Sequence, residues 1–281
     1  MRALRTDAGL TVEQVAEQLE CSTSKISRLE TGHRGARPRD VRDLCDLYGV
    51  EDAAVRDRLM ALAREGKEQA WWQSYELHSP TYVGLEDDAV SIRQYNASVV
   101  PGLLQTPDYA QAVTAAAFPR RSADVVTQEV AVRLTRQQLL TKKDPPQVQV
   151  VLDESVLRRV VGGPRVMRAQ MARLVEASGL PNVTIRIVPY GAGVLPAIES
   201  KFIILSFAPR DVSDVVFVEG MVGDLYLERL TDLQQYNEVF AILLDMALTA
   251  EESNGFITKL WSPGNGFDVL AADGSHDLGR S

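Results

Sequence analysis

The residues from Thr11 to Ser22 constrain the fold of this chain most, because they set the length and spacing of two short helices. Thr11 and Gln14 match a capping box, in which a Thr hydroxyl and a Gln side chain satisfy backbone N–H groups at the start of a helix. Ser22 is a suitable N-cap for a second helix. The sequence therefore predicts a helix that ends near Glu20, a tight turn through Cys21, and a second helix that begins after Ser22.

The apolar residues of this region recur at helical spacing, which predicts that each helix buries one face. In the first helix these residues are Val15, Ala16 and Leu19, and in the second they are Ile26 and Leu29. The outward face of the second helix is polar and carries Thr23, Ser24, Ser27 and Arg28, with Lys25 at its flank.

This polar face has the side chains that a DNA groove requires. Short hydroxyl side chains allow the backbone to approach a groove closely, and Arg presents a fork to guanine O6 and N7. A merely solvated helix face is the alternative interpretation of Thr23 to Arg28. The joint agreement of cap, turn, core and nearby basic residues favours DNA contact.

The charge distribution allows one DNA-facing surface on an otherwise acidic chain. The net charge is −8 over 281 residues, which by itself argues against a nucleic-acid partner. Residues 25–42, however, contain six basic and two acidic residues, a local balance of +4. The acidic remainder is expected to discourage indiscriminate binding.

The segment GLTVEQVAEQLECSTSKISRLETG, residues 9–32, resembles the Cro/phage-repressor (Xre) helix-turn-helix family, including its closing signature Leu29-Glu30-Thr31-Gly32. The resemblance covers about residues 1–50 and implies that the second helix of the motif enters the major groove. It implies base contacts from Thr23, Ser24 and Arg28. It implies phosphate contacts, which position the protein without specifying sequence, from Lys25, Thr31, Arg34, Arg37 and Arg39.

Two departures from the family pattern predict local strain or weakness. Glu20 stands where the family usually has Gly, so we expect a positive φ or a modified turn at a cost of about 1 kcal/mol. The family's first helix also begins a turn or two earlier, whereas Met1 to Ala8 would span only about 12 Å. We expect either a start upstream of Met1 or a first domain of marginal stability.

The sequence predicts two more helices in the remainder of the first domain. Residues 38–48 and 51–64 complete a compact, all-α, five-helix unit of the phage-repressor type. Polar residues after position 65 place the domain boundary at 66/67. The two cysteines, Cys21 and Cys45, exclude a disulfide scaffold and fall at inward positions. The expected core residues of the later helices are Val41, Leu44, Leu47, Leu59 and Leu62.

Residues 67–250 alternate between helical and strand patterns, which predicts a mixed α+β domain. The expected strands lie at 148–152, 183–187, 202–207, 215–219 and 225–227. The expected helices include one capped by Thr106, others at 128–142 and 164–178, and one opened by a second capping box at Thr231–Gln234. Trp71 and Trp72 are expected to anchor the core of this domain. Residues 251–281 are rich in Gly, Asp and Ser and are expected to form a flexible tail.

Several phrases of this second region also resemble a known family: YVGLEDDAVSIRQYNASVVPGLLQTPDYAQAV, GGPRVMRAQM, LPNVTIRIVPYGAG and DVVFVE. They are similar to the effector-like domain of unknown function that follows a helix-turn-helix in actinobacterial WhiJ-like regulators. The resemblance covers about residues 71–249. It implies transcription control, often alongside a small partner protein encoded nearby, and implies no known ligand or catalytic residue.

Catalytic and metal-binding patterns are weak throughout. Glu86-Asp87-Asp88 could hold a metal, but no His lies near it, and a solvated acidic turn is the expected structure. Gly162-Gly163 and Gly191-x-Gly193 do not complete a phosphate-binding fingerprint. We therefore expect no enzyme, no metal and no cofactor. Without a signal peptide or a membrane span in the sequence, we expect a cytoplasmic, nucleoid-associated protein.

The leading hypothesis is a sequence-specific transcription regulator that binds a pseudo-palindromic operator in double-stranded DNA as a homodimer. Its DNA affinity would be modulated by a ligand or a small partner protein bound to the second domain. The first alternative is a partner-binding protein, antitoxin-like or a scaffold, for which DNA binding is secondary. The second is an enzyme tethered to DNA, which would need a convergent polar pocket in the second domain.

Overall fold

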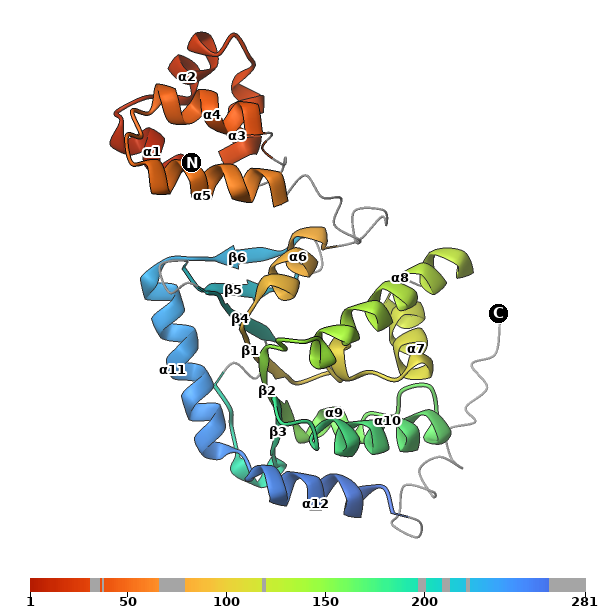
Figure 1. The fold of residues 1–281 in the computed structure, drawn as a ribbon. Helices are drawn as coiled ribbons and strands as arrows, with labels where there is room; N and C mark the ends of the chain where they lie inside the picture. Colours follow the sequence, from red (N-terminus) through yellow and green to blue (C-terminus); the bar gives the residue numbers. More distant parts are fainter. Residues whose placement is uncertain are drawn as a thin grey trace. The chain divides into compact units, whose positions relative to one another are not determined.

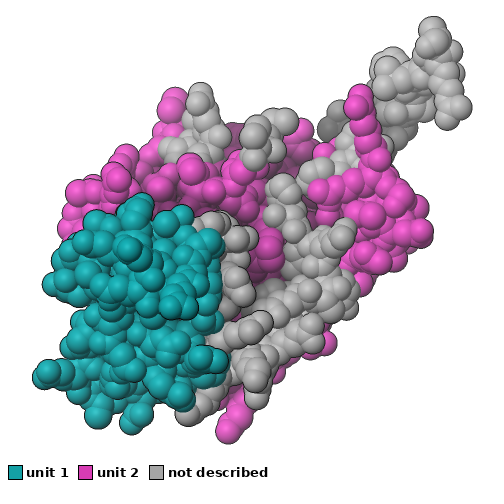
Figure 2. Space-filling view, turned by 90° about the horizontal axis from the view of Figure 1, so that it is seen from above, with its two compact units in different colours: residues 1–74 teal, residues 75–281 magenta. Residues whose placement is uncertain are grey.

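The computed structural model describes residues 1–30, 36, 38–65, 79–117, 120–196, 201–208, 213–220 and 223–262. The chain divides into two compact units, residues 1–74 and 75–281, which Figure 2 shows in separate colours. The boundary expected at 66/67, together with Trp71 and Trp72, lies outside the described residues. In the part of the chain that is described, no helix is long and apolar enough to cross a membrane.

The first unit is helical. Its helices are α1 (Arg2–Asp7), α2 (Val12–Gln18), α3 (Thr23–Glu30), α4 (Pro38–Leu47) and α5 (Ala53–Glu65). Four of the five apolar side chains that helical spacing assigned to the core of the motif, Val15, Ala16, Ile26 and Leu29, are buried together, and Leu19 is partly buried against them. Leu44 of α4 and Tyr48, which follows α4, complete this core.

The prediction that Leu62 belongs to the core of this unit is wrong. Leu62 is 55% exposed, whereas its neighbour Ala63 is buried in a cluster with Val41 and Cys45. Ala63 stands one turn beyond Leu59 and so continues the inward face of α5, whereas Leu62 is rotated away from that face. The prediction considered only large apolar side chains and therefore missed Ala63, the small residue at the inward position.

The second unit is built on a six-stranded mixed sheet in the order β3-β2-β1-β4-β5-β6, which confirms the α+β class. The half that contains β1, β2 and β3 is parallel, and the half that runs from β1 through β4 and β5 to β6 is antiparallel. Parallel neighbours need long crossovers, which here contain helices. The strands are β1 (Ser91–Asn96), β2 (Gln147–Asp153), β3 (Val183–Val188), β4 (Phe202–Ser206), β5 (Val215–Val218) and β6 (Leu225–Leu227).

The helices of this unit lie on both sides of the sheet, with α11 on one side and α7 to α10 on the other (Figure 1). The α-helices are α6 (Pro80–Asp88), α7 (Pro107–Ala117), α8 (Ala123–Arg136), α9 (Glu154–Arg158), α10 (Pro164–Ala177), α11 (Leu230–Met246) and α12 (Ala250–Leu260). Short 3₁₀ turns are η2 (Gly102–Leu104), η3 (Gln137–Thr141) and η4 (Tyr190–Ala192).

Because helices cover both faces of the sheet, successive residues of a strand pack against different helices. Tyr95, Phe202 and Val216 pack in one core with Phe240 and Leu243 of α11. The residues between them in the strands point to the other face, because side chains alternate along a strand. That second face carries a row of three paired residues, Gln94, Ile203 and Phe217.

The second capping box predicted at Thr231–Gln234 is wrong. Helix α11 begins at Leu230, and its N-cap, Arg229, makes no side-chain capping bond. A capping box does occur further along, where Thr249 and Glu252 exchange hydrogen bonds of 2.8 and 3.2 Å at the start of α12.

The flexible tail predicted from residue 251 is wrong for residues 251–262. Helix α12 occupies most of this segment, and Ile257 is buried in it. Ser253 accepts a hydrogen bond from the backbone N–H of Ile187 at 3.0 Å, and the Trp261 indole donates to the carbonyl of Leu157 at 3.1 Å. The Gly- and Asp-rich composition that suggested a tail belongs largely to residues 263–281, which lie outside the described residues.

Candidate nucleic-acid interface and an internal cavity

The two helices of the predicted motif begin where their capping residues indicate. The backbone N–H of Gln14 donates to the Thr11 hydroxyl at 3.2 Å, and the N–H of Thr11 donates to the Gln14 side chain at 2.9 Å, which confirms the capping box. The N–H of Lys25 donates to the Ser22 hydroxyl at 3.2 Å, which confirms Ser22 as the cap of α3. Local hydrogen bonds thus set the start of both helices.

The turn between these helices has the conformation that the sequence predicts for Glu20. Its φ is +47°, in the left-handed region that favours glycine. The N–H of Glu20 donates to the carbonyl of Glu17 at 3.1 Å, and the N–H of Cys21 donates to the carbonyl of Ala16 at 2.8 Å. This pair of bonds is a Schellman motif, which satisfies carbonyls at the end of α2 and redirects the chain toward α3.

The far end of α3 is tied to the rest of the unit by a two-point ion pair. The guanidinium of Arg5 donates to the two carboxylate oxygens of Glu30 at 2.7 and 3.0 Å, and also to the carbonyl of Leu10 at 2.7 Å. The Glu30 side chain is only 4% exposed. The Tyr48 hydroxyl donates to it at 3.5 Å, and burial, together with the Glu30 charge, raises the pKa of Tyr48 to about 12. Glu30 therefore orients α3 through contacts with α1 and with the end of α4.

The residues predicted to contact bases all belong to α3. Thr23 is its first residue and is exposed. Ser24 and Arg28 stand one helical turn apart on α3, and the placement of their side chains lies outside what the structure describes. The base-contact assignment stays a prediction.

The residues predicted to contact phosphates are placed less uniformly. Lys25 forms an ion pair with Asp40 of α4 at 2.7 Å, so its ammonium already has a partner within the unit. Arg39 on α4 is 89% exposed, with its guanidinium 3.9 Å from Asp43. Thr31, Arg34 and Arg37 lie outside the described residues. The phosphate assignment also stays a prediction.

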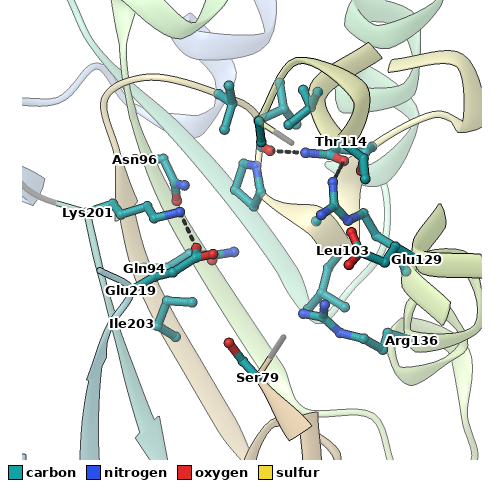
Figure 3. A pocket seen from close by; sticks show the side chains of 18 of the residues that line it. Ser79, Gln94, Asn96, Leu103, Thr114, Glu129, Arg136, Lys201, Ile203 and Glu219 are labelled. Carbon is teal, nitrogen blue, oxygen red and sulfur yellow. Dashed lines mark hydrogen bonds and ion pairs between the residues drawn. The ribbon is translucent and has the colours of Figure 1, made fainter. Parts of the chain in front are cut away.

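A second feature, which the sequence did not indicate, is a cavity of about 770 Å³ in the second unit. Its floor is the sheet row of Gln94, Ile203 and Phe217. Its walls come from α6, η2, α7 and α8. Figure 3 shows Gln94, Asn96 and Lys201 on one side of the space and Leu103, Thr114, Glu129 and Arg136 on the other.

One wall of the cavity contains a buried ion pair that corrects the prediction for residues 86–88. Glu86 is only 2% exposed and accepts hydrogen bonds from Arg136 at 2.6 and 2.8 Å, as well as one from the Tyr82 hydroxyl. The expected solvated acidic turn is therefore wrong. Glu86 follows Tyr82 by one turn on the inward face of α6, and its counter-charge comes from the end of α8, 50 residues later. Nothing local to residues 86–88 signals that partner.

The electrostatics of this pair follow from its burial. Burial opposes the charge on Arg136, but the Glu86 carboxylate more than offsets that effect and raises the pKa of Arg136. For Tyr82, whose ionised form is an anion, burial raises the pKa, and the adjacent Glu86 raises it further. Arg136 also lies over the Tyr82 ring, with its guanidinium carbon 5.1 Å from the ring centroid. Both side chains of the pair therefore have their partners within the protein.

Arg133 lines the same cavity one turn earlier on α8, but its partner is neutral. Its guanidinium donates to the Gln105 side-chain oxygen at 2.8 Å, and the Gln105 amide donates in turn to the carbonyl of Val100 at 2.6 Å. Burial, with the neighbouring charge of Arg136, lowers the pKa of Arg133 to about 10. Among the described residues, no carboxylate lies within ion-pair distance of Arg133.

Two polar groups in the cavity lining, on Asn96 and Thr114, lack partners within the described part of the chain. The side-chain oxygens of Asn96 and Thr114 have no hydrogen-bond partner among the described residues, although the two residues are only 7% and 1% exposed. Buried polar atoms are nearly always hydrogen-bonded in proteins. The described residues contain no cluster of three or more His, Cys, Asp or Glu side chains that could hold a metal ion.

Comparisons with known proteins agree with both resemblances found in the sequence. A family model described as a helix-turn-helix domain matches residues 1–59. A second, described as a domain of unknown function (DUF5753), matches residues 79–259, which is more than half of the chain. No curated protein and no solved structure matches. The helix-turn-helix domain indicates a DNA-binding regulator.

Proposed function

The chain belongs to the DUF5753 family, and since a helix-turn-helix domain precedes that domain, we propose that the protein is a sequence-specific transcription regulator. Its DNA affinity is modulated by a small molecule that occupies the cavity of the second unit. The observation that carries the proposal is the geometry of α3, whose start is capped by Ser22 and whose end is held by the Arg5–Glu30 pair.

This geometry supports DNA reading because a recognition helix must be held rigidly by its own domain. Ile26 and Leu29 bury one face of α3 in the core of the unit. Thr23 is exposed, and Ser24 and Arg28 follow it at a spacing that suits neighbouring base pairs. Arg39, on the following helix, is exposed and suits a phosphate contact at the edge of the groove.

The proposal includes a homodimer on a pseudo-palindromic operator. One such helix contacts few base pairs, and two copies related by a two-fold axis read two half-sites about 34–36 Å apart. The second unit offers the larger surface for self-association, and a change in its occupancy that alters the distance between the two reading helices would change DNA affinity.

Genome-wide occupancy of the tagged protein, with Arg28→Ala as the control variant, tests this function. We expect sharp peaks that share a two-fold motif and that disappear in the variant. Peaks that persist unchanged in Arg28→Ala would contradict the assignment of the reading helix. Flat occupancy by the native chain, with stable capture of a protein partner by residues 75–281, would instead support the alternative of a partner-binding protein.

A further inference from the structure

The size and composition of the cavity suit a small organic molecule. A volume of about 770 Å³ lies within the range of pockets that enclose drug-sized ligands, about 300–1,000 Å³. Its lining is largely apolar and includes Val83, Leu103, Val113, Val132 and Phe217. Such a lining suits a hydrocarbon or aromatic body and leaves the few polar groups to determine which molecule is retained.

Among the described residues, two cations of the lining, Arg133 and the exposed Arg159, have no carboxylate within ion-pair distance, and only Arg133 is shielded from solvent. Each acidic side chain that lines the cavity has its own basic partner: Glu86 pairs with Arg136, Glu129 with Arg121, and Glu219 with Lys201. Arg133 differs because its hydrogen-bond acceptor among the described residues is the neutral amide of Gln105. Arg133 is partly buried, and a partly desolvated cation without a counter-charge is energetically unfavourable. A ligand with a single negative charge would supply the missing partner.

The geometry of Arg133 also favours a carboxylate. Gln105 holds one terminal nitrogen of the guanidinium and is itself fixed by Val100, so the side chain is oriented before any ligand arrives. The remaining N–H groups form the planar fork that binds carboxylates at two points. An oriented, desolvated Arg loses little conformational freedom when it binds.

The unpartnered oxygens of Asn96 and Thr114 define a second requirement. Asn96 is on β1 and Thr114 on α7, and Figure 3 shows them on different sides of the space. A hydroxyl or amide group on the ligand would satisfy one of them. We propose that the cavity binds a small amphipathic organic carboxylate, with the anionic group on Arg133 and a hydroxyl or amide group at Asn96 or Thr114. That such binding alters DNA affinity rests on the proposed function, whereas the binding itself does not.

A matched pair of fluorescent probes tests the charge requirement in the full chain. 8-Anilinonaphthalene-1-sulfonate carries one negative charge, and N-phenyl-1-naphthylamine is the same ring system without it. We expect the sulfonate to bind at a single site per chain. Arg133→Gln should weaken that binding by about tenfold to a hundredfold, while the affinity for the neutral amine stays unchanged. Arg229→Gln, which removes an exposed Arg of the same unit, is the matched control and should leave both affinities unchanged.

A displacement experiment on the native chain keeps the inference testable if Arg133→Gln fails to fold. Decanoate should displace the bound sulfonate probe, and 1-decanol at equal concentration should not. Equal displacement by the two, or none by decanoate, would overturn the inference. So would native affinity of folded Arg133→Gln for the sulfonate.

The DNA readout is separate from these binding measurements. If decanoate displaces the probe but leaves operator affinity unchanged, the carboxylate site stands and its proposed role in modulating DNA binding is wrong. If displacement fails while Arg28→Ala still weakens operator binding, the carboxylate site is wrong and the DNA-reading function stands.

Discussion

Arg5 and Glu30 form a two-point ion pair with N–O distances of 2.7 and 3.0 Å, which joins the first helix of the chain to the last residue of α3. Both side chains are largely buried, at 13% and 4% exposure. The Glu of the Leu-Glu-Thr-Gly signature thus has a structural role, which is to hold α3 at a defined angle to the rest of its unit. A change at either residue should affect stability and DNA binding together.

Glu30→Gln removes the carboxylate and leaves Arg5 as an uncompensated, largely buried cation. We expect a loss of about 3 kcal/mol in the free energy of unfolding of the first unit, measured by urea denaturation. Arg39→Gln is the control, because the 3.9 Å pair between Arg39 and Asp43 is exposed and should contribute less than about 0.5 kcal/mol. Equal effects of the two substitutions would show that the Arg5–Glu30 pair does not stabilise the unit.

Glu20→Gly should stabilise the first unit by about 1 kcal/mol, because the φ of +47° at this position strains any residue with a Cβ atom. The same substitution three residues earlier provides a control of opposite sign. Glu17 lies inside α2, so Glu17→Gly should cost about 1 kcal/mol through lost helix propensity. Thermal unfolding of the two variants side by side distinguishes backbone strain at position 20 from a general effect of removing a negative charge.

Arg28→Ala and Arg39→Ala should affect DNA binding differently. Loss of a base contact at Arg28 should cost about 1–3 kcal/mol on the operator and relax the preference at one base pair. Loss of a phosphate contact at Arg39 should weaken binding to all sequences alike and reduce the slope of log affinity against log salt by about one unit. Titrations on operator and random DNA at several salt concentrations check both. If the two variants lose the same affinity on random DNA, the roles assigned to these residues are wrong.

Glu86→Gln should destabilise the second unit by about 3–5 kcal/mol, because it leaves Arg136 charged and buried. Glu176→Gln is a suitable control, since Glu176 is 72% exposed and its pair with Arg173 lies on the surface of α10. Denaturation followed by circular dichroism measures both variants. A Glu86→Gln chain as stable as the control would mean that the pair contributes no net stability.

Local patterns were enough to predict the helical motif and most of the strands. The capping bonds of Thr11 and Ser22, and the strained turn at Glu20, all depend on residues within a few positions of one another. The alternation in β2 and β3 also follows from the sequence, because one face of each strand is apolar. Strand β1 was not predicted, since Gln94 and Asn96 are polar residues at buried positions.

The cavity could not be predicted because its polar groups come from distant segments. Glu86 pairs with Arg136, and Arg133 donates to Gln105; the two members of each pair are far apart in the sequence, so no short stretch contains either pair. The acidic run at 86–88 has the composition of a solvated turn, and only the tertiary fold brings a cation to Glu86. Similarly, the Gly-, Asp- and Ser-rich composition of residues 251–281 gave no indication that this segment begins within a capped helix, α12.

The pairing of β1 has a consequence for the order in which the chain folds. Ser91 at its start pairs with Gln147 on one side and with Ser206 on the other. Contacts between such distant residues form slowly, because long loops must close first. The contacts of the first unit span far shorter separations. During synthesis, therefore, the helical unit can be complete while β1 still lacks both of its neighbours. A nascent chain stalled before residue 147 would contain a folded helical unit and a β1 segment with neither of its partner strands.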